Sequence, residues 1–117
     1  MKTICKMREV LKALAQFETA FEKEYLLTLN EAMVLCALEE AKGKITSTAI
    51  AERIGMCTSL ASKNIRSVED MGLIERTMGQ TDKRQMYFSL TPAGELRLQE
   101  LTLDKVEVPD LLKPVLV

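Results

Sequence analysis

Apolar residues recur at intervals of three and four along the first 25 positions of the chain. Side chains with this spacing share one stripe of an α-helix, so the pattern predicts a long N-terminal helix. The stripe consists of Ile4, Met7, Leu11, Leu14, Phe17, Phe21 and Tyr25, widened by Val10, Ala13 and Ala20. So broad a face leaves two interpretations open: an ordinary core helix, or a helix that also packs against a second subunit.

A second helix is predicted to begin at Thr28, which forms a capping-box pattern with Glu31. The run from Ala32 to Leu38 is apolar at every position, which predicts burial on nearly every side, and Cys36 within it is expected to serve packing. Gly43 is expected to close this helix. The segment 44–46 is too short for an independent strand, but it could pair with a hairpin elsewhere.

Two short helices separated by a few residues are predicted next, which is the arrangement of a helix-turn-helix. The first is capped by Thr46 or Ser47 and ends at Gly55, and its inward residues are Ile50, Ala51 and Ile54. The second covers residues 58–71, with Thr58 as the expected cap and Gly72 as its stop. Its buried face consists of Ala61, Ile65 and Val68.

The pattern then changes to two strands, at 73–76 and 85–90, joined by a polar loop that forms a hairpin tip. Thr91 and Pro92 are typical of a helix start, and this helix is expected to continue to about Val106 and to end before Pro109. Residues 108–117 are too apolar to remain in water, so this tail is expected to dock on another surface.

Composition narrows the class of protein. The 117 residues fit one domain, and the chain has no histidine, nucleophile motif or phosphate-binding glycine loop, so we expect neither an enzyme nor a cofactor. Neither a signal peptide nor a transmembrane segment is recognisable, which favours a cytoplasmic protein without membrane contact.

The net charge is −1, but residues 42–84 contain eight Lys or Arg against five Asp or Glu. Positive charge is therefore concentrated in the middle of the chain.

Four segments in order resemble the MarR family of winged-helix regulators. Residues 49–56 are similar to its first helix-turn-helix helix, and residues 72–76 to the GLV-x-R segment before its wing. Residues 82–84 match the DxR of the wing, and residues 90–94 the LTxxG that follows. The resemblance implies a mainly α (α+β) winged helix-turn-helix fold, with a long N-terminal helix, a two- to three-stranded wing sheet and a short C-terminal helix.

The expected organisation has three parts: a dimerisation helix at 1–27, a DNA-binding domain at 28–94, and a C-terminal helix with an apolar tail at 95–117. Family members usually continue with longer helices after the wing, whereas 23 residues follow Gly94 here. We therefore expect the first helix and the tail to carry more of the homodimer interface.

The second helix of the helix-turn-helix carries small polar and cationic side chains opposite its apolar face, as a helix in the major groove requires. These residues are Thr58, Ser59, Ser62, Lys63, Arg66 and Ser67. Ser62, Lys63 and Arg66 are candidates for base or phosphate contact, and the first-turn N–H groups of Thr58 and Ser59 suit a phosphate. A merely solvated face is the alternative.

In the predicted wing, the resemblance assigns Arg84 to the minor groove. Asp82 is expected to orient an arginine through an ion pair, or simply to form a turn. Lys83 and Arg76 would add attraction for phosphate, unless they are ordinary surface charges.

The predicted function is therefore a sequence-specific transcriptional regulator that binds a double-stranded DNA operator as a homodimer, with any small-molecule effector unidentified. The alternative is a winged helix used as a protein–protein interaction module without DNA binding. Oxidant sensing through Cys5 or Cys57 has little support, although Cys57 lies near a helix N-terminus where a thiolate is stabilised.

Overall fold

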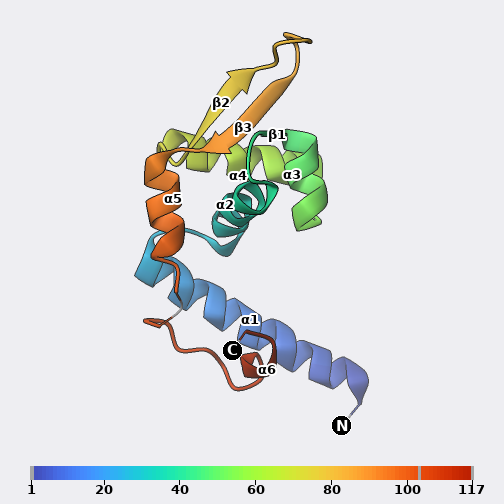
Figure 1. Ribbon diagram of the computed structural model, residues 1–117. Coiled ribbons are helices and arrows are strands. Elements are labelled where there is room, and N and C mark those ends of the chain that lie inside the picture. The colour runs from blue at the N-terminus through green and yellow to red at the C-terminus, as the bar shows by residue number, and fades with distance from the viewer. Residues whose placement is uncertain (1, 103, 117) are drawn as a thin grey trace. The chain divides into compact units, whose positions relative to one another are not determined.

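The computed structural model describes residues 2–102 and 104–116 (Figure 1). These residues form two compact units. One contains the described residues up to Leu29 together with those from Thr102 onward, and the other is Asn30–Leu101.

The first unit is built on helix α1, Thr3–Tyr25, which confirms the predicted long helix. Only Ala13, Phe17 and Phe21 are buried on it. The Phe21 ring centroid lies 6.1 Å from that of Phe17 and 4.9 Å from that of Tyr25. These three rings form an aromatic cluster that makes up the C-terminal half of the stripe.

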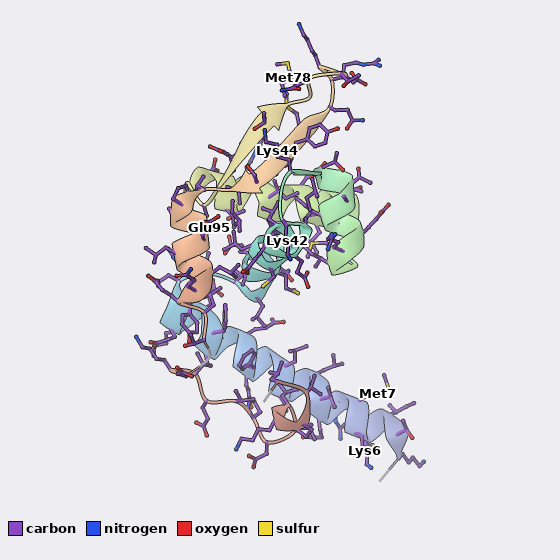
Figure 2. The ribbon with its side chains drawn as sticks, viewed as in Figure 1. Lys6, Met7, Lys42, Lys44, Met78 and Glu95 are labelled. Atoms are coloured by element: carbon purple, nitrogen blue, oxygen red, sulfur yellow. The ribbon has the colours of Figure 1, made fainter. Side chains whose placement is uncertain are left out.

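The N-terminal half of the same stripe is exposed. Its exposed residues are Ile4, Met7, Val10, Leu11 and Leu14, with exposed fractions from 37% at Leu14 to 78% at Ile4. Figure 2 shows the Met7 side chain pointing away from the helix. The described chain therefore leaves half of the apolar stripe without a cover.

In its described residues, 102 and 104–116, the C-terminal segment of this unit is irregular apart from the short helix α6, Lys113–Leu116. Pro109 does not end a long helix; its carbonyl accepts hydrogen bonds from the N–H groups of Leu112 and Lys113 in the turn that leads into α6. Val106 and Leu112 are buried, whereas Leu111 and Val115 are exposed. The tail is thus only partly packed.

The second unit has the element order predicted for a winged helix-turn-helix. Its elements are α2 (Leu29–Ala41), β1 (Ile45–Thr46), α3 (Ser47–Ile54), α4 (Thr58–Asp70), β2 (Ile74–Met78), β3 (Met86–Leu90) and α5 (Pro92–Gln99). The strands form an antiparallel sheet in the order β1-β3-β2. The hairpin of β2 and β3 is the wing, and Figure 1 shows it projecting beyond the helices of this unit.

The core of this unit is formed by most of α2, by one face each of α3 and α4, and by the base of the sheet. Its buried side chains include Val34, Leu35, Leu38, Ile50, Ala51, Ala61, Ile65, Val68, Leu73, Ile74 and Phe88. Helix α4 buries Ala61, Ile65 and Val68 as expected, and α3 buries Ile50 and Ala51, whereas Ile54 is only partly buried; the polar faces of both helices point outward. These faces are what the fold makes available for recognition.

Two expectations for α2 are wrong. Met33 and Cys36, three residues apart on one side of the helix, are exposed, so Cys36 does not pack in the core. The residue with left-handed backbone after this helix is Lys42, with φ of 52°, and Gly43 has no positive φ. An apolar run therefore marks a buried helix without fixing the burial of each position.

The end of α5 is also earlier than expected. The helix stops at Gln99 instead of continuing to Val106, and the N–H of Leu101 bonds to the carbonyl of Leu98 in a tightened last turn. Thr102 and Asp104 follow, and both residue types form helices poorly. These local preferences outweigh the apolar spacing that suggested a longer helix.

The segment 90–94 joins the wing to α5 and the end of α4. The Thr91 hydroxyl donates to the Gly72 carbonyl at 2.7 Å and accepts from the Gly94 N–H at 3.1 Å. Gly94 lies so close to the Leu73 carbonyl that a Cβ there would collide with it. The LTxxG pattern therefore serves to fix the base of the wing.

Candidate nucleic-acid interface

Helix α4 begins at an exposed N-terminus. Its N-cap is Cys57, which makes no side-chain capping bond, so the expectation that Thr58 is the cap is wrong. The Cys57 Sγ lies 3.5 Å from the Ser59 Oγ. This hydrogen bond, with a contribution from the Leu60 backbone, lowers the pKa of the exposed Cys57 thiol. The pKa of Cys36 is raised, because neighbouring groups partly desolvate its thiol although the residue lies at the surface, and because Glu40 and Glu39 are close.

The outward face of α4 carries the predicted small polar and cationic residues. Thr58, Ser59, Ser62, Lys63 and Arg66 are all exposed. Ser67 is not part of this face, which corrects the sequence assignment. Its hydroxyl donates to the carboxylate of Glu31, a residue of α2 that is only 7% exposed.

A hollow of about 600 Å³ lies between α4, the start of α3 and the wing strands. It is lined by Ser47, Ser59, Ser62, Lys63, Ile65, Arg66, Arg76, Met86 and Phe88. Three of the predicted cations, Lys63, Arg66 and Arg76, thus share one concave surface. None of its described lining residues is acidic, so the sign of the charge suits an anion.

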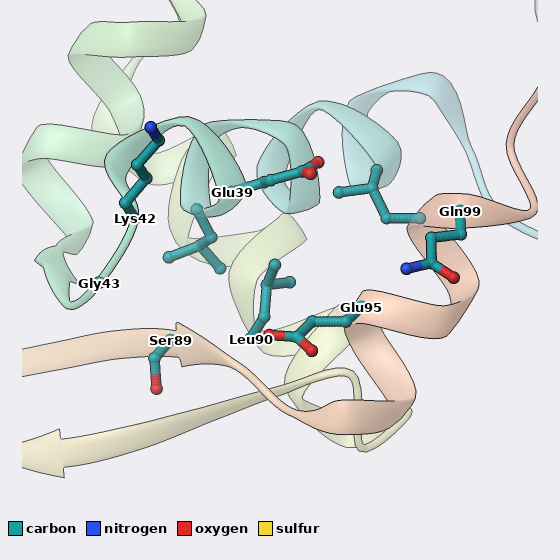
Figure 3. Close-up of a pocket in the computed structure, with 9 residues that line it drawn as sticks. Glu39, Lys42, Gly43, Ser89, Leu90, Glu95 and Gln99 are labelled. Atoms are coloured by element: carbon teal, nitrogen blue, oxygen red, sulfur yellow. The ribbon is translucent and has the colours of Figure 1, made fainter.

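A second hollow, of about 450 Å³, lies between α2, the end of β3 and α5 and has a different charge (Figure 3). Its polar rim includes the carboxylates of Glu39 and Glu95 and the ammonium of Lys42. Two negative groups against one positive group would repel a phosphate backbone. Of these two hollows, the one beside α4 is therefore the candidate nucleic-acid surface.

The tip of the wing carries the other predicted residues, Asp82, Lys83 and Arg84, none of which lines the hollow beside α4. Lys83 is exposed, and the Arg84 side chain is 93% exposed. The Asp82 Oδ1 accepts from the Arg84 backbone N–H at 2.9 Å and from Arg84 Nε at 3.3 Å. These bonds, the backbone one first, lower the pKa of Asp82.

Arg76, in strand β2 of the wing, is 47% exposed but is paired with groups of the protein. Its Nε and Nη2 each donate to Glu69, at 2.8 Å, and its guanidinium lies 5.4 Å from the centre of the Phe88 ring. The hydrogen bonds raise the pKa of Arg76 and lower that of Glu69. Sequence reasoning missed Glu69, although an acid at the end of α4 and a basic residue just after a tight glycine turn are a recognisable pairing signal.

The described residues form neither a metal site nor a membrane-spanning helix. Within the described ranges, no set of three or more Cys, Asp or Glu side chains is arranged to hold a metal ion. None of the helices in the described part of the chain combines the length and the apolar character needed to cross a bilayer.

Comparison with known proteins agrees with this architecture. The structure is similar to that of the YusO protein from Bacillus subtilis, with a TM-score of 0.68 at 24% identity over 87% of this chain and 74% of that one. It is also similar to the transcriptional regulator BldR from Sulfolobus solfataricus, with a TM-score of 0.67 at 21% identity over 86% and 77% of the two chains.

A third similar structure is a mutant of S. aureus MepR bound to an oligodeoxyribonucleotide, with a TM-score of 0.68 at 18% identity over 87% of this chain and 75% of that one. No curated protein sequence matches the chain significantly. A sequence profile of the MarR family matches residues 27–85, which is half of the chain. The chain therefore belongs to the MarR family, with the winged helix-turn-helix fold of that family's regulators.

Proposed function

We propose that the chain is a transcriptional regulator that binds double-stranded DNA, with α4 in the major groove and the wing arginine in the adjacent minor groove. The observation that carries the proposal is the hollow beside α4, where Lys63 and Arg66 line a concave surface without an acidic lining residue among those described. Side chains of this kind contact phosphates and base edges, whereas carboxylates would repel the backbone.

The N-terminal half of α4 supplies the groove contacts in this proposal. Ser62, Lys63 and Arg66 extend toward base edges and phosphates, because they lie on the exposed side of the helix. The first-turn N–H groups at Thr58 and Ser59 have no helical acceptor and carry the positive end of the helix dipole, so they suit one phosphate.

The wing supplies a second contact. Arg84 is long and exposed, and Asp82 accepts hydrogen bonds from both its backbone N–H and its Nε, which favours one orientation of the guanidinium. A narrow minor groove concentrates negative potential and attracts such an arginine. Lys83 beside it adds attraction for phosphate without sequence preference.

We further propose a homodimer that uses the exposed apolar half of α1. A stripe that includes Ile4, Met7 and Leu11 on one helix is larger than the isolated exposed apolar residues of an ordinary surface. A dimer would present two copies of α4 to a two-fold operator, with half-sites about one helical turn apart. Such a regulator would act in the cytoplasm.

The similar MepR structure contains bound oligodeoxyribonucleotide, and BldR is described as a transcriptional regulator, which supports a DNA-binding role for this fold. The test is a mobility-shift assay on duplexes selected by the chain from a random-sequence library, repeated with excess unrelated competitor duplex. We expect a complex that resists the competitor. Failure to retain any duplex would favour a protein–protein interaction module instead.

A further inference from the structure

A three-residue contact connects the recognition helix to both strands of the wing. Glu69 is in the last turn of α4, Arg76 is in β2, and Phe88 lies opposite Arg76 in the register of β3. The guanidinium of Arg76 forms two parallel hydrogen bonds with Glu69 and covers the Phe88 ring. The two bonds of this fork fix both the distance and the orientation of the partners.

The covalent connection between α4 and β2 is short but does not fix the wing along its length. It contains Gly72, whose φ of 77° gives the sharp reversal, and Thr91 anchors the Gly72 carbonyl. A five-residue strand is about 17 Å long, so a rotation of about 10° at its base would move its tip by about 3 Å. Contacts beyond the turn therefore help to hold the wing tip at a defined distance from α4. The pairing of β1 with β3 is one of them, and the Glu69–Arg76 contact joins α4 directly to β2.

The charges of this contact also bear on its role. The Glu69 carboxylate occupies Nε and Nη2 of Arg76 and offsets its positive charge. Arg76 thus contributes little net attraction for a phosphate, although it lines the hollow beside α4. Its hydrogen bonds connect two elements of the protein to each other. We call the contact of Arg76 with Glu69 and Phe88 the brace.

We propose that Glu69 and Arg76 are positioning residues for DNA binding: their ion pair, seated on Phe88, sets the angle between α4 and the wing so that both reach one duplex. The inference rests on the proposed DNA binding. It predicts that an acidic residue close to the DNA surface favours binding, which is the opposite of what its charge alone would do.

The first test measures affinity for a duplex selected by the wild-type chain. Glu69→Gln and Arg76→Lys should each weaken binding about tenfold or more, since a lysine cannot form the fork. Glu75→Gln is the matched control, because it removes the same charge from the exposed neighbour of Arg76; binding should be unchanged or slightly tighter. The double variant Glu69→Gln/Arg76→Lys should lose little more than either single variant.

Two readouts separate positioning from direct contact and from misfolding. Loss of one phosphate contact lowers the slope of log affinity against log salt concentration by about 0.9. Arg76→Gln should leave this slope unchanged. Spin labels on Cys57 and on Gln80→Cys, with Cys5 and Cys36 replaced by Ser, measure the separation of α4 and the wing tip without DNA. This distance distribution should broaden in Glu69→Gln while thermal unfolding stays cooperative.

The outcomes distinguish this inference from the proposed function. If the wild-type chain selects a duplex and Lys63→Ala weakens binding, but Glu69→Gln binds as tightly as wild type, the brace is wrong and the function stands. An unchanged spin-label distance in Glu69→Gln also overturns the brace. If the wild-type chain selects no duplex, the proposed function fails, and the brace as a device for DNA binding fails with it.

Discussion

Asp82 holds Arg84 by two bonds to a single oxygen: the Asp82 Oδ1 accepts from the Arg84 backbone N–H at 2.9 Å and from its Nε at 3.3 Å. The aspartate therefore shapes the wing tip and also orients the arginine that the tip presents. This relationship makes an acidic residue useful on a surface that we propose to face DNA.

Replacement of Asp82 should accordingly weaken DNA binding, even though it removes a negative charge. Asp82→Ala loses both bonds and should reduce affinity about tenfold, whereas Asp82→Asn keeps an oxygen for the backbone N–H and should lose less. Quantitative mobility shifts check the order of the two variants. Tighter binding by Asp82→Ala would contradict the orienting role.

The same contact gives a pH dependence. Because the folded pKa of Asp82 is lowered, its contribution is complete above the ordinary aspartate pKa and is lost only as the pH falls through the lowered value. A carboxyl NMR titration should show this low midpoint. In Arg84→Gln the midpoint should rise only partly, since the backbone N–H of residue 84 is the larger cause.

The cations of the two hollows should differ in their effect on binding. Lys63→Ala should lower affinity and reduce the slope of log affinity against log salt by about 0.9, as expected for one lost phosphate contact. Lys42→Ala removes the same charge from the hollow that contains Glu39 and Glu95, and its slope should match that of wild type. Equal slopes for both variants would contradict the assignment of the interface to the α4 side.

Gly94 provides a test of the base of the wing. A Cβ at this position would collide with the Leu73 carbonyl and lie 3.2 Å from Leu90 Cδ2, so Gly94→Ala should lower the free energy of unfolding by about 1–3 kcal/mol. Gly43→Ala is the control, because its Cβ would meet open space and its φ is not positive. The control should be neutral or slightly stabilised. Chemical denaturation measures both.

Self-association is expected to depend on the exposed half of α1. Leu11→Glu places a charge in the apolar stripe and should shift the chain to monomer in sedimentation velocity. Gln16→Glu introduces the same side chain on another exposed face of α1 and should leave the mass unchanged. A wild-type chain that is monomeric at high concentration would overturn the proposed dimer.

Much of the fold could be predicted because local signals agreed with the final packing. Periodic apolar residues such as Ala61, Ile65 and Val68 identified the buried face of α4, and Thr91 with Pro92 identified the start of α5. Helix ends were less predictable. Where α5 stops depends on a balance of small propensities around Thr102, which apolar spacing does not reveal.

Most partners of individual side chains could not be predicted, since they depend on distances between elements; the Glu69–Arg76 pair across the Gly72 turn is one that the sequence pattern did signal. Ser67 looked like a recognition residue, yet Glu31 from α2 reaches it. Arg76 looked like a free surface cation; its side chain is 47% exposed, but it bonds to Glu69 and lies over the Phe88 ring. Cys36 looked buried but is exposed, because a continuous apolar run does not reveal which side of the helix has no neighbouring element.

The most direct measurement is affinity cleavage of bound DNA by iron–EDTA attached at Cys57 or at Gln80→Cys, with Cys5 and Cys36 replaced by Ser. If α4 and the wing tip face one duplex, the two positions should cut the same half-site, with centres about 5 base pairs apart, half a helical turn. Cleavage from the wing position should follow the minor groove. Cleavage from one position alone, or from both at unrelated places, would contradict a shared DNA-binding face.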